Sequence, residues 1–163
     1  MTIGKPMANG HPVAAVLARP EVLGAFRDAF GYFNTFGGNP VSAAASLAVL
    51  DVLDDEGLMA NANLVGSYMQ DRMAALRHPL LAETRGRGFF FGAEFVLNAD
   101  MTPATAFAAE VVERMLTRGI LLNRIGRQMN TIKMRPPMPF SRENADTVLD
   151  ALTKVLAETP VPA

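Results

Sequence analysis

The chain is organised around residues 4–12, which read Gly-Lys-Pro-Met-Ala-Asn-Gly-His-Pro. Glycine, proline and the Asn-Gly pair favour tight turns, so this segment predicts a fixed, closely turned backbone. Lys5 is the only lysine or arginine in it. A crowded lysine loses its proton more easily, and the neutral amine can then condense with an aldehyde. From the loop alone, an ordinary lysine in a turn is the favoured interpretation and the reactive lysine is the alternative.

Composition limits the classes of function that are open to this protein. The chain has 163 residues, of which 50% are hydrophobic and 19% charged, so it can bury a substantial core. A net charge of -1 without a long basic run argues against nucleic-acid binding. The absence of cysteine excludes disulfides, thiolate metal sites and thiol catalysis. Residues 1–4 lack the features of a signal peptide, and no apolar run approaches the ~20 residues of a membrane span. We therefore expect a soluble, cytoplasmic protein.

Two further segments carry candidate binding groups. Residues 33–40 read Phe-Asn-Thr-Phe-Gly-Gly-Asn-Pro, in which the Thr35 hydroxyl and the N–H groups beside the glycines suit phosphate oxygens. A simple glycine turn before the next helix fits the same pattern. Residues 133–137 read Lys-Met-Arg-Pro-Pro, and the two prolines would fix the direction of the Arg135 guanidinium for a grip on a carboxylate. An arginine on an exposed strand edge is the alternative.

These three segments, in this order and spacing, resemble the class III pyridoxal-phosphate-dependent aminotransferases, which have fold type I. The resemblance covers essentially the whole chain. Members of the family are much longer, and their lysine lies well past the middle of the chain. The sequence therefore resembles the C-terminal portion of such an enzyme, and we expect a fragment of a dimeric transferase with an α/β fold.

The resemblance implies a role for each candidate residue. Lys5 matches the lysine that forms a Schiff base with pyridoxal 5'-phosphate and then moves the substrate proton. Thr35 matches the ligand of the cofactor phosphate, given across a dimer interface to the neighbouring subunit. Arg135 matches a position that binds the substrate carboxylate. The cofactor is the electron sink in this chemistry.

The implied reaction transfers an amino group from an amino acid, ω-amino acid or other amine to a 2-oxo acid, in a homodimer or together with a complementing N-terminal half. Decarboxylases, mutases and lyases share the scaffold. The alternative is an inactive fragment or a subunit that needs an upstream half. In the family, the glycine/serine phosphate loop, the aromatic residue stacked on the cofactor ring and the aspartate at the ring nitrogen lie upstream of the matched part.

The resemblance also implies a domain organisation. We expect residues 1–40 to be a remnant of the large cofactor-binding domain, residues 41–78 to be connector helices, and residues 79–163 to form a small C-terminal α/β sandwich domain. The apolar run 13–18 predicts a buried strand, and Pro20 suits the first position of a helix.

The C-terminal half gives the sharper predictions of local structure. Residues 89–97 form the clearest strand, with residues 85–88 as the turn that leads into it. Thr102 is expected to cap a helix that begins at Pro103, and Ser141 to begin the last helix. The short apolar run 120–122 predicts another strand.

The remaining polar residues carry weaker signals. His11 and His78 each precede a proline and are expected to cap turns, and the spacing of acidic and histidine residues predicts no metal site. A rival interpretation rests on residues 87–91, which partly resemble the RNA-recognition strand motif. Phe90 stands where that motif has a small residue, and the chain is not basic, so we interpret these phenylalanines as core.

Overall fold

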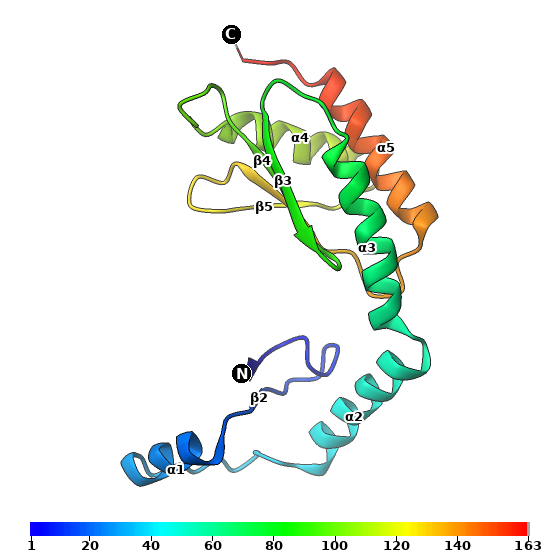
Figure 1. Cartoon of the computed structure of the whole chain (residues 1–163). Helices are drawn as coiled ribbons and strands as arrows, with labels where there is room; N and C mark the ends of the chain where they lie inside the picture. Colours follow the sequence, from blue (N-terminus) through cyan, green and yellow to red (C-terminus); the bar gives the residue numbers. More distant parts are fainter. Residues whose placement is uncertain (163) are drawn as a thin grey trace. The chain divides into compact units, whose positions relative to one another are not determined.

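The computed structural model describes residues 1–162, and its contacts group into two units, Met1–Gly57 and a second that begins at Leu58 (Figure 1). We call these the N-terminal unit and the C-terminal unit. The N-terminal unit contains the antiparallel pair β1 (Thr2–Ile3) and β2 (Ala15–Val16), followed by α1 (Pro20–Ala29) and α2 (Pro40–Asp55). No helix within residues 1–162 is long and apolar enough to cross a membrane.

The N-terminal unit buries very little of its apolar surface. Helix α1 begins at Pro20, as predicted, but none of its residues is buried. The prediction of a buried strand over residues 13–18 is wrong, because only Ala15 and Val16 are extended and Val16 is 62% exposed. A short apolar run does not specify its partner, and β2 pairs only with the two-residue β1 among the described residues.

The C-terminal unit is a four-stranded antiparallel sheet with helices packed on one face. Its order along the chain is α3 (Leu58–Ala74), β3 (Leu81–Arg87), β4 (Phe90–Phe95), α4 (Thr105–Thr117), β5 (Asn123–Ile125), β6 (Thr131–Met134) and α5 (Arg142–Glu158). The strands lie in the order β3-β4-β6-β5. This layered arrangement agrees with the predicted α/β fold class.

The core lies between the sheet and the three helices. Alternate residues of a strand point to opposite faces. Phe91, Ala93 and Phe95 of β4 are buried against apolar side chains of α3, α4 and α5, whereas Phe90 on the other face is 54% exposed. The interpretation of all three phenylalanines 89–91 as core is therefore wrong for Phe90. Within the described residues of this unit, no helix covers that other face of the sheet, and we call it the outer face.

Three local predictions in the C-terminal unit are wrong. Residues 85–87 belong to β3, and the turn follows at Gly88 with a φ of 53°. Their charged side chains on the outer face hide the apolar alternation that marks a strand. Helix α4 starts at Thr105, because Leu97 donates to the Thr102 carbonyl at 2.8 Å and holds that segment against the end of β4. The strand predicted over residues 120–122 is also displaced, because β5 covers Asn123–Ile125.

The last helix is formed as predicted. Ser141 is the N-cap of α5, and its side-chain oxygen accepts a hydrogen bond from the Asn144 N–H at 3.2 Å. The Asn144 side chain in turn accepts from the Ser141 N–H at 3.1 Å. This reciprocal pair is a capping box, which satisfies two backbone donors at the start of the helix.

Candidate functional site

The loop that carries Lys5 is a chain of hydrogen-bonded turns. The Gly4, Pro6 and Ala8 carbonyls accept from the N–H groups three residues later, at 2.9, 3.2 and 3.1 Å. Asn9 and Gly10 have φ values of 47° and 112°, which an Asn-Gly pair adopts at low cost. The turned backbone predicted for residues 4–12 is therefore present, and we call this segment the lysine loop. The Lys5 side chain is exposed, not crowded.

The segment that carries Thr35 is a turn over residues 35–38, which we call the glycine turn. Asn34 organises it, since its carbonyl accepts from the Gly37 N–H and its side chain accepts from the Phe36 N–H, each at 3.2 Å. Gly38 has a φ of 70°, and an added Cβ there would meet open space. Thr35 is exposed. An exposed hydroxyl beside an uncrowded glycine is a donor set that fits phosphate oxygens.

The lysine loop and the glycine turn are connected through the start of α2. His11 Nε2 lies 2.8 Å from Ser42 Oγ. The Asn39 side chain, which is the N-cap of α2, donates to Ser42 Oγ at 2.9 Å and to the Phe36 carbonyl at 2.8 Å. Lys5 and Thr35 thus lie on two segments of the N-terminal unit that one hydrogen-bond network joins.

Sequence reasoning did not predict the role of His11 in this network. A histidine before a proline suggested a turn cap, which is what His78 provides, because its Nδ1 accepts from the Leu80 N–H at 3.2 Å. His11 instead bonds to a residue 31 positions away. The available signal was the Asn39-to-Ser42 spacing, which is typical of an N-cap with a hydroxyl in the first turn.

Arg135 belongs to the C-terminal unit and directly follows β6. Its guanidinium carbon lies 5.5 Å from the centre of the exposed Phe90 ring, a cation–π contact on the outer face. The loop after Pro137 is fixed by Asn61 of α3, which donates to the Met138 and Phe140 carbonyls at 2.9 and 3.1 Å. Sequence reasoning missed Asn61, because a polar residue in a helix does not reveal a partner in a distant loop.

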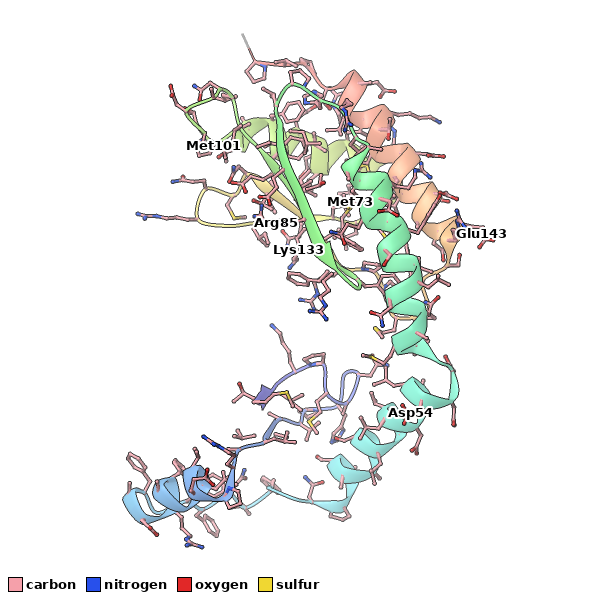
Figure 2. All side chains as sticks on the ribbon, viewed as in Figure 1. Asp54, Met73, Arg85, Met101, Lys133 and Glu143 are labelled. Carbon is pink, nitrogen blue, oxygen red and sulfur yellow. The ribbon has the colours of Figure 1, made fainter. Side chains whose placement is uncertain are left out.

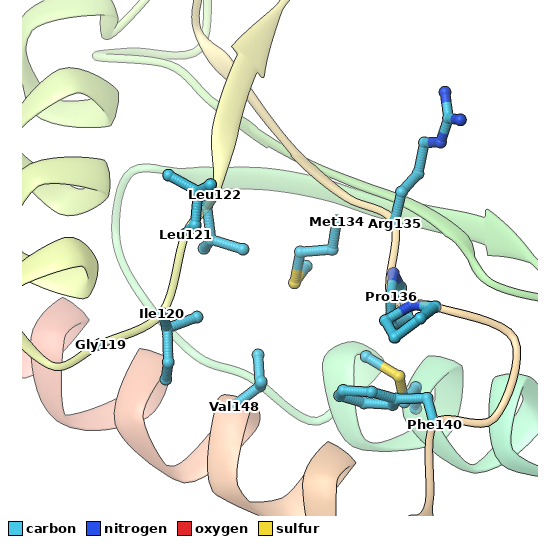
Figure 3. Close-up of a pocket in the computed structure, with 11 residues that line it drawn as sticks. Gly119, Ile120, Leu121, Leu122, Met134, Arg135, Pro136, Phe140 and Val148 are labelled. Atoms are coloured by element: carbon cyan, nitrogen blue, oxygen red, sulfur yellow. The ribbon is translucent and has the colours of Figure 1, made fainter. Parts of the chain in front are cut away.

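A pocket opens beside Arg135, but it is lined mainly by apolar side chains. They include Met69, Ile120, Leu122, Met134 and Phe140. Figure 3 shows the Arg135 side chain pointing away from them. Hydrocarbon walls do not suit a charged substrate. The guanidinium itself is exposed, and a carboxylate is a partner that fits its planar pair of donors.

Other cations share the outer face with Arg135. The strand register places Arg85 and Lys133 on either side of Gly92, and Arg87 opposite Phe90. Figure 2 labels Arg85 and Lys133 on the sheet. Arg85 is neutralised by Glu83 at 2.7 Å and Glu94 at 2.8 Å, and its hydrogen bond to Glu94 raises the pKa of the guanidinium above its ordinary value. Among the ion pairs of residues 1–162, Arg87, Lys133 and Arg135 have no acidic partner.

Comparison with known proteins gives the family. The model of the family described as aminotransferase class-III matches residues 1–156. The chain is 38% identical over 155 residues to alanine–glyoxylate aminotransferase 2 homolog 2, mitochondrial, from Arabidopsis thaliana, covering 93% of this chain and 32% of that protein.

Two solved structures of enzymes are also similar to this chain. A phospholyase from Arthrobacter in complex with phosphoethanolamine is 45% identical with a TM-score of 0.90, covering 98% of this chain and 38% of that one. An amine transaminase from an uncultivated Pseudomonas species, in its PLP-bound form, is 26% identical with a TM-score of 0.84, covering 98% of this chain and 38% of that one. The chain thus spans about a third of the length of these relatives. It belongs to the class III aminotransferase family, whose cofactor is pyridoxal phosphate, and it has part of the fold-type-I transferase fold.

Proposed function

We propose that this chain is the C-terminal portion of a pyridoxal-phosphate-dependent aminotransferase that transfers an amino group from an amino acid, ω-amino acid or other amine to a 2-oxo acid. The observation that carries the proposal is the exposed Lys5 amine on a hydrogen-bonded loop, within the stretch that the family model matches. When bound, the cofactor supplies an electron sink for the substrate's reacting carbon.

Each candidate residue contributes a different action. The Lys5 amine would hold the cofactor covalently and would move the proton of the substrate carbon. The Thr35 hydroxyl donates to a phosphate oxygen, and the Arg135 guanidinium holds a substrate carboxylate through paired hydrogen bonds. Residues 1–40 then serve as the remnant of the large domain, residues 41–78 as the connector, and residues 79–163 as the small domain.

The active form proposed here is larger than one copy of this chain. Thr35 would serve the cofactor of a neighbouring copy in a homodimer, and a complementing N-terminal half would supply the groups that the family places upstream. The exposed apolar side chains of the N-terminal unit support association, among them Tyr32, Phe33 and Phe36, which are 70%, 87% and 79% exposed. We place the assembly in the cytoplasm, a reducing compartment with which a chain without cysteine is compatible. An inactive fragment is the competing outcome.

A second candidate reaction is the removal of phosphate from a phosphorylated amine. The observation that favours it is the group of cations on the outer face, Arg87, Lys133 and Arg135, which lack acidic partners among the described residues. A phosphate dianion needs more positive charge than a carboxylate does. The Arthrobacter relative is a phospholyase in complex with phosphoethanolamine. Release of inorganic phosphate without a 2-oxo acid would identify this reaction, whereas a requirement for the 2-oxo acid would identify amino transfer.

The first test is reduction of the purified chain with borohydride in the presence of pyridoxal phosphate, followed by peptide mapping. Lys133 and Lys154 are the other lysines of the sequence and serve as internal controls. Selective labelling of Lys5, lost in Lys5→Arg, is the expected result. Equal labelling of the three lysines would refute the cofactor role of Lys5 in this chain. Adding the N-terminal portion of a family member then tests complementation.

A further inference from the structure

We infer that His11 is a positioning residue that holds the lysine loop and the glycine turn in a fixed relation through Ser42 and Asn39. The inference rests on the proposed function, in which Lys5 and Thr35 both bind the cofactor. Among the hydrogen bonds of residues 1–162, the His11–Ser42 bond is the one that joins a side chain of the lysine loop to another segment. Its donor and acceptor atoms lie 2.8 Å apart.

Ser42 can serve both of its side-chain partners at once. It lies in the first turn of α2, is only 8% exposed, and accepts from the Asn39 side chain at 2.9 Å. A hydroxyl accepts through its lone pairs and still has its own hydrogen to donate, so the His11 ring is accommodated without displacing Asn39. Removing the ring leaves a nearly buried hydroxyl without that partner, which has a cost in free energy.

Asn39 carries the connection on to the glycine turn. Its Oδ1 accepts from the Ser42 N–H at 2.9 Å, while its Nδ2 donates both to Ser42 Oγ and to the Phe36 carbonyl. The Phe36 N–H is held by the Asn34 side chain, so Thr35 lies between two anchored residues. A change at His11 therefore reaches Thr35 through two side chains. If Thr35 serves the neighbouring copy, the same network links the two cofactor positions of a dimer.

Backbone conformation brings the ring into place. The positive φ values of Asn9 and Gly10 turn the chain immediately before His11, and the His11 N–H closes the last turn of the loop on the Ala8 carbonyl at 3.1 Å. His11 thus has its backbone in the lysine loop and its side chain on α2. This placement distinguishes it from a histidine that caps its own turn, which would leave the loop free to move relative to Thr35.

The test compares His11→Leu with His11→Gln in the full chain by NMR measurement of amide exchange. Leucine removes the hydrogen bond, whereas the glutamine amide can replace it. We expect His11→Leu to speed exchange roughly five-fold at Met7 and Asn9 and also at Gly37 and Asn39, the equivalent of about 1 kcal/mol for one hydrogen bond. His11→Gln should stay near the unsubstituted chain. Faster exchange confined to the lysine loop would overturn the inference.

Ser42→Ala provides a second test, in which no residue of the lysine loop is substituted. It removes the His11 bond from the other side together with the bond from Asn39 Nδ2, so it should speed exchange in both segments at least as much as His11→Leu does. In the double variant, exchange should match that of Ser42→Ala alone, because the His11–Ser42 bond is already absent in that variant. Additive effects would show that His11 and Ser42 act separately, contrary to the inference.

Labelling with pyridoxal phosphate and borohydride separates this inference from the proposed function. Where Lys5 of the unsubstituted chain is labelled selectively, His11→Leu should lower its labelling roughly five-fold relative to Lys133 and Lys154, and His11→Gln should restore it. Unchanged labelling in His11→Leu would overturn the positioning role. Where Lys5 of the unsubstituted chain is not labelled, the cofactor role fails, and the amide exchange alone decides whether His11 couples the two segments.

Discussion

Substitution of Gly66 tests the closest approach between a helix and the sheet in the C-terminal unit. A Cβ added at Gly66 of α3 would lie 2.3 Å from the Gly88 carbonyl oxygen and 2.7 Å from its carbon. Both are backbone atoms of the turn between β3 and β4, so no side chain can rotate away. The turn also determines where Arg85 and Arg87 lie on the outer face.

The magnitude follows from two opposing effects. Ordinary contact begins near 3.4 Å, so α3 and the turn would have to separate by about 1 Å. Overpacking of this kind costs roughly 1–3 kcal/mol or more, whereas alanine is more favourable than glycine inside a helix by about 1 kcal/mol. We expect Gly66→Ala to lower the free energy of unfolding by about 1–2 kcal/mol, which is a decrease in Tm of roughly 5–15 °C for a unit of this size.

The assay follows unfolding in urea and on heating through the methyl resonances of Ile132, which is fully buried in the core of this unit. Ser67→Ala is the matched control, since Ser67 is the next residue of α3 and is exposed. It should be neutral or slightly stabilising. A Gly66→Ala chain as stable as the control would refute the close packing of α3 against the turn at Gly88.

Three further predictions concern pH, capping and association. Burial lowers the pKa of His78 below its ordinary value of 6.5, so near that pH the unfolded chain binds more protons than the folded chain. The free energy of unfolding, measured by urea titration at several pH values, should therefore fall as the pH drops below about 6.5. His78→Asn keeps an acceptor but does not titrate, and it should lose this pH dependence. Ser141→Ala removes the capping box of α5 and should cost about 1 kcal/mol in urea unfolding, whereas Thr147→Ala on the exposed side of α5 should cost less. The exposed apolar side chains of the N-terminal unit should cause concentration-dependent association in sedimentation experiments, and Phe33→Ser should weaken that association. A monomer at all concentrations would contradict the prediction.

Local chemistry in the sequence was sufficient to predict several elements. Pro20 and Ser141 give the starts of α1 and α5, because proline fits the first helical position and serine accepts from the backbone N–H groups of the first turn. The lysine loop was predicted as a chain of turns for the same kind of reason. Where charged residues lined an exposed face, as in β3, the local pattern was hidden and the strand was predicted as a turn.

The same distinction between local and distant information applies to the candidate site. The residue types and motifs of Lys5, Thr35 and Arg135 are visible in the sequence, together with the family that they indicate. The partners that hold their segments are not visible, because His11 bonds to a residue 31 positions away and Asn61 to a loop more than 70 positions away. No local propensity specifies such pairs.

By itself, the sequence determined the family, the turn chemistry around Lys5 and Thr35, and the helices with clear start signals, because these depend on backbone preferences within a few residues. The tertiary structure alone decided the register that gathers Arg87, Lys133 and Arg135 on one open face, and the network that joins the lysine loop to the glycine turn. Such features depend on which distant segments meet, and that is determined by the packing of the whole unit.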